Sequence, residues 1–360
     1  MKKLFSTQKV NTGRQIEWDY TKVFAIILLI VTHYLAYCSL GNADFEKTTD
    51  TMFILAQIST PVLMFAMGIG MAYTRHDSPR DFIVRGIKLL LLGMIVNTMY
   101  FLSNYTGGIP MDYSLSSFLA NNILHFAGLT FILVGIFKMY NFRTIKIFII
   151  SIGFSLIASY TSDFTFGNIY LNQFLGNFIE TVGKNIITCF PVLNWFIIPI
   201  CGMLFGENLI RCNYKDELYS RIIRPAHTMT FIIMIVGIAL FEGMFSVTGG
   251  TIIEKLKYLH ASLPEMVVLI ILTVFIGSIF YFLTKKSSPS VIDFIIKTSH
   301  NVTVIYIIQL ALILLLTYIN QFLNVKPNLG IEIAVLILII VSSILLGHAY
   351  AGVKGHLMKS

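Results

Sequence analysis

The dominant pattern along the chain is a series of apolar runs separated by short polar stretches. A helix that crosses a bilayer needs about 20 largely apolar residues. Ten segments have this character, approximately residues 20–39, 52–73, 82–102, 119–140, 145–160, 186–209, 228–247, 264–283, 302–318 and 331–350. The fifth is short, and Pro191 and Pro199 interrupt the sixth. The pattern predicts an all-α polytopic membrane protein with about ten transmembrane helices.

Composition supports this prediction, because 56% of the 360 residues are hydrophobic and only 12% are charged. Soluble domains usually carry about a quarter charged residues. The basic N-terminus is not followed by a short apolar core with a cleavage site, so we expect a retained first helix. With no linker or internal repeat, we predict one transmembrane domain over residues 1–360, with a cytoplasmic arm (1–19) and a cytoplasmic tail (351–360).

The basic residues are distributed asymmetrically between alternate loops. Of the 26 Lys and Arg residues, all but five fall on one predicted side, and the five are Lys47, Lys184, Lys255, Lys257 and Lys326. Basic residues collect in cytoplasmic loops, so both termini are predicted to be cytoplasmic. The same rule explains the net charge of +8 without nucleic acid, which we do not expect as a partner.

Cysteine spacing gives no sign of a structural cross-link. Cys38, Cys189, Cys201 and Cys212 show neither paired nor metal-type spacing. We therefore predict no disulfide framework and no metal site.

Ionisable residues share one face of the first predicted helix. Asp19, Lys22 and His33 are spaced 3 and 11 residues apart, which places them within roughly 60° at about 100° per residue. An ionisable ring at membrane depth suggests a functional site, and a neutral imidazole can serve as a general base. Two alternatives stay open: His33 bonds to a neighbouring helix, or Asp19 is a helix-start acid paired with Lys22.

The densest cytoplasmic basic cluster follows the second span. It comprises Arg75, Arg80, Arg85 and Lys88. Such a cluster either anchors the protein by the positive-inside rule or binds phosphate through charge and hydrogen bonds.

Other polar residues fall at membrane depth. Asn122 and His125 are three residues apart, Asn194 and Trp195 follow Pro191 in the interrupted segment, and Gln309 shares a face with Tyr306. Each either lines a cavity or joins helices by hydrogen bonds, and Trp195 has the further alternative of an interfacial anchor. Gly68 and Gly70 are expected to permit close helix packing. Residues 161–184 are too polar to span and are expected to form an interfacial or re-entrant segment.

The order of these motifs resembles the acyltransferase-3 family and its relatives of the heparan-α-glucosaminide acetyltransferase type. Glu17–Lys22, followed after ten residues by His33, resembles a first-helix motif of Arg, ten residues and His. Residues 122–128 resemble an ILQxxG element, residues 190–202 an FPxxPW element and residues 306–309 a YxxH/Q element. Lys22 replaces the motif Arg, and Gln309 stands where His is common.

The resemblance implies an integral membrane acyltransferase that moves an acyl group, expected to be acetyl, from cytoplasmic acyl-CoA to a hydroxyl or amine of a surface or cell-envelope glycan. It implies catalytic roles for His33, Asp19 and Lys22. Cofactor contacts would come from Arg75, Arg80, Arg85 and Lys88, and the substrate cavity would be lined by Asn122, His125, Asn194, Trp195 and Gln309. Expected partners are membrane lipid and a carbohydrate or glycolipid acceptor, and the expected location is a bacterial cytoplasmic membrane.

Two other classes of function stay open. A secondary transporter or flippase would lack covalent chemistry and would need a buried carboxylate for ion coupling. A catalytically inactive member that binds a partner would fit the substitutions at Lys22 and Gln309. The oligomeric state is also open, a homo-oligomer included.

Overall fold

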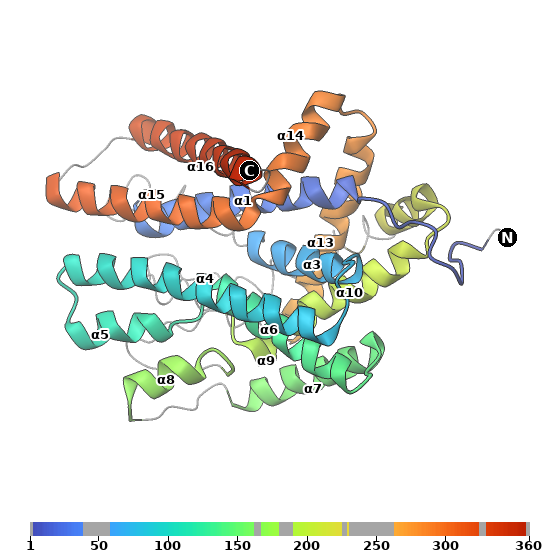
Figure 1. Ribbon diagram of the computed structural model, residues 1–360, viewed down its shortest axis with the longest axis horizontal. Coiled ribbons are helices and arrows are strands. Elements are labelled where there is room, and N and C mark those ends of the chain that lie inside the picture. Colours follow the sequence, from blue (N-terminus) through green and yellow to red (C-terminus); the bar gives the residue numbers. More distant parts are fainter. Residues whose placement is uncertain are drawn as a thin grey trace. The chain divides into compact units, whose positions relative to one another are not determined.

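The computed structural model describes residues 3–38, 58–161, 167–179, 190–224, 229, 263–323 and 329–357 (Figure 1). Its elements are α1 (Ile16–Tyr37), α3 (Ser59–Ala72), α4 (Pro79–Thr106), α5 (Met111–Ser116), the 3-10 helix η1 (Ser117–Leu119), α6 (Ile123–Met139), α7 (Thr144–Tyr160), α8 (Ile169–Leu175), α9 (Val192–Trp195), α10 (Ile197–Ile210), α13 (Leu263–Thr284), α14 (Pro289–His300), α15 (Val302–Leu323) and α16 (Leu329–Leu357). Within these ranges the secondary structure is helical, apart from an isolated β-bridge between Phe5 and Cys212.

The all-α, polytopic membrane class is confirmed. Among the described residues, seven helical segments are long and apolar enough to cross a membrane, and α3 and α7 are shorter apolar helices. Together they coincide with nine of the predicted segments, and the tenth, 228–247, lies outside the described residues. The total of ten spans and the cytoplasmic side of the termini stay predictions.

The chain forms two compact units. Unit 1 comprises Met1–Gly13 and Met64–Phe275, and unit 2 comprises Arg14–Leu63 and Ile276–Ser360. The expectation of one functional domain over 1–360 stays a prediction.

In unit 1, α4 and α6 lie side by side with their backbones close together (Figure 1). A Cβ added at Gly86 would lie 2.6 Å from the carbonyl oxygen of Gly128, and one added at Gly128 would lie 2.8 Å from that of Gly86. Small residues at such a crossing allow the helices to pack backbone to backbone.

A second close crossing in unit 1 joins α3 to α10. A Cβ at Gly68 would lie 1.9 Å from the carbonyl oxygen of Pro199, and one at Gly202 would lie 2.1 Å from that of Phe65. The expected packing role of Gly68 is therefore confirmed. Gly70 is exposed and has no atom within 4 Å of the equivalent position, so the same expectation for Gly70 is wrong.

The sixth predicted segment is broken, as the two prolines predict. α9 ends at Trp195 and α10 begins at Ile197. Just before α9, Phe190 has a φ of 56°, a conformation that non-glycine residues rarely adopt. The side-chain amide of Asn121 donates to the carbonyl oxygen of Phe190 at 2.9 Å and helps to hold this turn.

The N-terminal arm of unit 1 closes the end of α10. The backbone N–H of Ser6 donates to the carbonyl of Arg211 at 2.8 Å, and those of Val10 and Asn11 donate to the carbonyl of Ile210 at 3.0 and 2.9 Å. The last carbonyls of a helix have no partner within the helix, so the arm satisfies groups that would otherwise be left open.

Unit 2 is built around α1, which packs against α14, α15 and α16 (Figure 1). Trp18 is 2% exposed, and its ring occupies the space left by Gly277, where a Cβ would lie 2.7 Å from Cη2. α14 lies within a stretch that the charge pattern had treated only as a basic loop. It buries Thr298 and Ser299 near its end, and this brings a polar edge against the start of α1.

Candidate active site

His33 is partly buried on α1 and pairs with Gln309 of α15 within unit 2. The side-chain nitrogen of Gln309 lies 2.8 Å from Nδ1 of His33, and Gln309 is fully buried. The ring of Tyr306 lies 5.8 Å from that of His33, and the ring of Tyr37 lies 6.4 Å away. The arrangement holds one ring nitrogen by an amide and surrounds the imidazole with aromatic side chains.

The orientation of the Gln309 amide decides which nitrogen of His33 can act as a base. With Nε2 of Gln309 donating to Nδ1, the ring proton lies on Nε2 of His33. With the amide rotated by 180°, Oε1 of Gln309 accepts from Nδ1–H, and the lone pair lies on Nε2 of His33. Oε1 of Gln309 is buried and has no hydrogen-bond partner among the described residues.

Asp19 is the centre of a second polar cluster in unit 2. The carboxylate is 3% exposed and accepts from Nε of Arg14 at 2.5 Å and from the Ser299 hydroxyl at 2.6 Å. Nζ of Lys22 lies 3.5 Å from Oδ1 of Asp19. The possibility that Asp19 pairs with Lys22 is thus realised in the structure.

His300 of α14 extends this cluster by a hydrogen bond between Nη1 of Arg14 and its Nε2. Partial burial and the nearby Arg14 and Lys22 cations hold the pKa of His300 below its ordinary value, while Asp19 acts in the opposite direction. A neutral ring is what this contact requires, because Nε2 must accept from the guanidinium. Arg14, Ser299 and His300 were not predicted site residues.

The two clusters lie at different heights on α1. Lys22 and His33 are 11 residues apart, about 16 Å at 1.5 Å per residue. Asp19 and Lys22 therefore do not touch His33. The shared helix face is real, but the three residues do not form one contact group.

The predicted cofactor residues belong to unit 1. Arg75 follows α3, and Arg80, Arg85 and Lys88 lie on the first turns of α4, all four exposed. The guanidinium of Arg85 lies 4.6 Å from the centre of the Phe131 ring.

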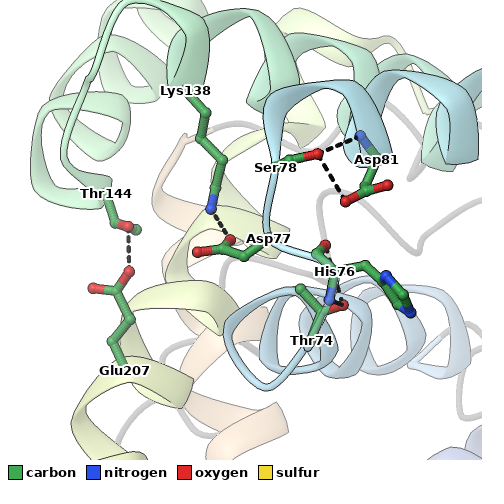
Figure 2. Close-up of polar contacts among 8 residues, drawn as sticks. All are labelled: Thr74, His76, Asp77, Ser78, Asp81, Lys138, Thr144 and Glu207. Carbon is green, nitrogen blue, oxygen red and sulfur yellow. Dashed lines mark hydrogen bonds and ion pairs between the residues drawn. The ribbon is translucent and has the colours of Figure 1, made fainter.

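Figure 2 shows the turn that carries Arg75 into α4. Ser78 caps α4, because its hydroxyl accepts from the backbone N–H of Asp81 at 3.1 Å. Asp77 pairs with Lys138 of α6, and the Thr144 hydroxyl donates to Glu207. The turn is therefore fixed by its own acids and cap, while the arginines extend outward from it.

Asn122 has a clear structural task in unit 1. Its Oδ1 accepts from the backbone N–H groups of Leu124 and His125 at 2.9 and 3.1 Å. Its Nδ2 donates to the Gly93 carbonyl at 3.1 Å and to Oδ1 of Asn97 at 2.8 Å. Asn122 is the N-cap of α6, which explains it without a substrate.

His125 packs into the space left by Gly93, where a Cβ would lie 2.9 Å from the imidazole. Its Nδ1 is buried and has no hydrogen-bond partner in the described part of the chain. Asn194 is 6% exposed and accepts from the Ser155 hydroxyl at 3.0 Å. Trp195 is fully buried, with the Phe190 ring edge-on at 5.2 Å, so it is not an interfacial anchor.

The predicted site residues are thus divided between the units. His33, Asp19, Lys22 and Gln309 belong to unit 2, and the remaining eight belong to unit 1. Within the ranges described, no three His, Cys, Asp or Glu side chains are grouped so as to hold a metal ion.

The helices and the buried histidine define a polytopic membrane protein with an ionisable centre at membrane depth. Residues 14–241, more than half of the chain, match the sequence model of the heparan-alpha-glucosaminide N-acetyltransferase catalytic family. The chain belongs to this family and is a membrane enzyme of the acetyltransferase type. The match supports that branch of the resemblance and does not extend to the acyltransferase-3 family. No curated protein matches the chain, and no solved structure matches it.

Proposed function

We propose that this enzyme transfers an acetyl group from cytoplasmic acetyl-CoA to a hydroxyl or amine of a surface or cell-envelope glycan, with His33 as general base. The observation that carries the proposal is the pairing of His33 with the buried Gln309 amide at 2.8 Å. His33 lies in the segment that matches the acetyltransferase family. A buried imidazole fixed at one nitrogen can accept a proton at the other.

The proposed step is an acyl transfer. The acceptor oxygen or nitrogen attacks the thioester carbonyl carbon, a C–O or C–N bond forms, and the C–S bond breaks. His33 takes the proton that the acceptor loses and returns it to the departing thiolate of coenzyme A. No other reactant is needed.

The donor's phosphates would meet the exposed cations of unit 1. Arg75, Arg80, Arg85 and Lys88 carry positive charge at the predicted cytoplasmic end of α4. Arginine binds phosphate through its planar set of donors, and lysine binds it as a point charge. The Asp19–Lys22 cluster would orient the start of α1, on the side from which the donor enters.

The transporter alternative keeps one point of support. It requires a buried carboxylate in a span, and Glu332 of α16 is 3% exposed. Membership in an acetyltransferase family favours the enzyme, and a transporter would not cleave acetyl-CoA.

The test is transfer of labelled acetyl from acetyl-CoA by the purified full chain in lipid nanodiscs. We expect His33→Ala to lose at least about 100-fold in rate, which is the usual contribution of a general base. His348→Ala is the matched control, because His348 lies in the same unit and bonds to Thr298 at 3.0 Å. Full transfer by His33→Ala, or equal losses in both variants, would contradict the assignment of His33.

A further inference from the structure

Glu332 is a buried acid that the proposed mechanism does not use. It lies in the first turn of α16 and is 3% exposed. Its Oε2 is buried and has no hydrogen-bond partner among the residues that the structure describes. Acids are rare at such positions in membrane helices and usually mark a site, and a buried polar atom without a partner is costly.

The surroundings of Glu332 connect it to the helix that carries His33. Its charge acts on Tyr34 and on Cys38, both on the last turns of α1. Tyr34 is the residue next to His33, and α16 packs against both α1 and α15. In Figure 1 the N-terminal part of α16 lies at the end of unit 2 where α1 finishes.

The seam between α1 and α15 is polar along this part of its length. After the His33–Gln309 pair, Sγ of Cys38 lies 3.5 Å from the Thr317 hydroxyl and 3.8 Å from the carbonyl oxygen of Ile313. Polar groups therefore continue from His33 to the end of the helix pair, which is also where Glu332 lies. An apolar helix contact would not need them.

The helix dipole gives a partial explanation of Glu332. An acid in the first turn of a helix is stabilised by the N-terminal end of the dipole. Glu265 in the first turn of α13 is such a case, and it is only partly buried. The dipole explains the position of Glu332 but neither its burial nor its open oxygen.

We infer that Glu332 binds the acceptor, accepting a hydrogen bond from a sugar hydroxyl or amine whose neighbouring nucleophile faces His33. The inference rests on the proposed acetyl transfer. By the distribution of basic residues, this end of α1 and α16 is predicted to be the non-cytoplasmic end, the side of a surface glycan. A carboxylate suits this role because it only accepts hydrogen bonds, and hydroxyl and ammonium groups donate them.

The experiment compares the wild-type chain with Glu332→Gln in nanodiscs, using methyl α-D-glucosaminide and methyl α-D-glucoside as acceptor probes. For the probe that the wild type acetylates faster, we expect the acceptor KM to rise about 10- to 100-fold in Glu332→Gln, as for a lost hydrogen bond to a charged group. The KM for acetyl-CoA and the slow hydrolysis of acetyl-CoA without acceptor stay unchanged. Glu265→Gln is the matched control for loss of a first-turn acid and keeps wild-type values.

The outcomes separate this inference from the proposed function. A wild-type chain that neither hydrolyses acetyl-CoA nor transfers acetyl overturns both. Hydrolysis without acetylation of either sugar overturns the acceptor site alone, and so does an unchanged acceptor KM in Glu332→Gln.

If Glu332→Gln does not fold, Cys38 gives a second measurement with Glu332 intact. In a chain with the other cysteines replaced by serine, saturating sugar probe should slow labelling of Cys38 by a methanethiosulfonate reagent. Labelling at the same rate with and without the probe overturns the inference.

Discussion

The interlock between α3 and α10 predicts a large loss of stability from a single methyl group. In Gly202→Ala the new Cβ would lie 2.1 Å from the carbonyl oxygen of Phe65. An ordinary contact between carbon and oxygen needs about 3.4 Å, so the two backbones must separate by more than about 1 Å. Neither backbone can rotate away as a flexible side chain would.

The magnitude follows from the kind of atom that obstructs the methyl group. Overpacking a well-packed interior usually costs about 1–3 kcal/mol. Because the obstruction here is backbone, we expect the upper end, about 3 kcal/mol. At roughly 2–4 °C per kcal/mol for a unit of this size, the unfolding midpoint should fall by about 6–12 °C.

Thermal unfolding of the detergent-purified chain, followed by circular dichroism, measures this change. Gly70→Ala is the matched control, because it lies on the same helix, is exposed and has no atom within 4 Å of the added Cβ. It should be neutral or slightly stabilising, since alanine favours helix by up to about 1 kcal/mol over glycine. Equal midpoints for the two variants would refute the interlock.

Two further predictions concern the clusters on α1. Gln309→Leu should lower kcat for acetyl transfer about 10-fold with the KM for acetyl-CoA unchanged, because His33 loses the group that fixes its tautomer; Gln309→His should restore much of the rate, and a loss confined to KM would contradict this. The lowered pKa of His300 means that the folded state binds fewer protons than the unfolded state below the ordinary value of about 6.5. Stability should therefore be lost as pH falls through that value, and thermal unfolding between about pH 8 and pH 5 should show a weaker pH dependence in His300→Gln; an identical dependence would exclude His300 as its source.

Features that depend on one helix at a time could be predicted from the sequence. Hydropathy located nine described helices, and the prolines located the break between α9 and α10. These features follow from the length of an apolar run and from local backbone chemistry. α14 was missed because a 12-residue helix in a charged loop is too short for a span signal.

Features that depend on how two helices meet could not be predicted. Gly68 and Gly70 are two residues apart in equally apolar sequence, yet only Gly68 meets α10. Asn122 was expected to line a cavity or join helices, and its bonds to Gly93 and Asn97 come from the way α4 lies beside α6. The residue type limits what a side chain can bond to, and the crossing decides what it does bond to.

The pair formed by His33 and Gln309 shows how far this limit reaches into the site. Both residues were selected from the sequence, but they are 276 positions apart, and the packing of α15 on α1 makes them partners. The same packing carries Glu332 to the end of the seam, although a single acid at the start of a long apolar run gave no signal of its own. The family match ends at residue 241, before α15 and α16 begin. The groups that would orient His33 and receive the acceptor thus lie in the part of the chain that the match does not cover, and variants there are the sharpest test of how this member uses its histidine.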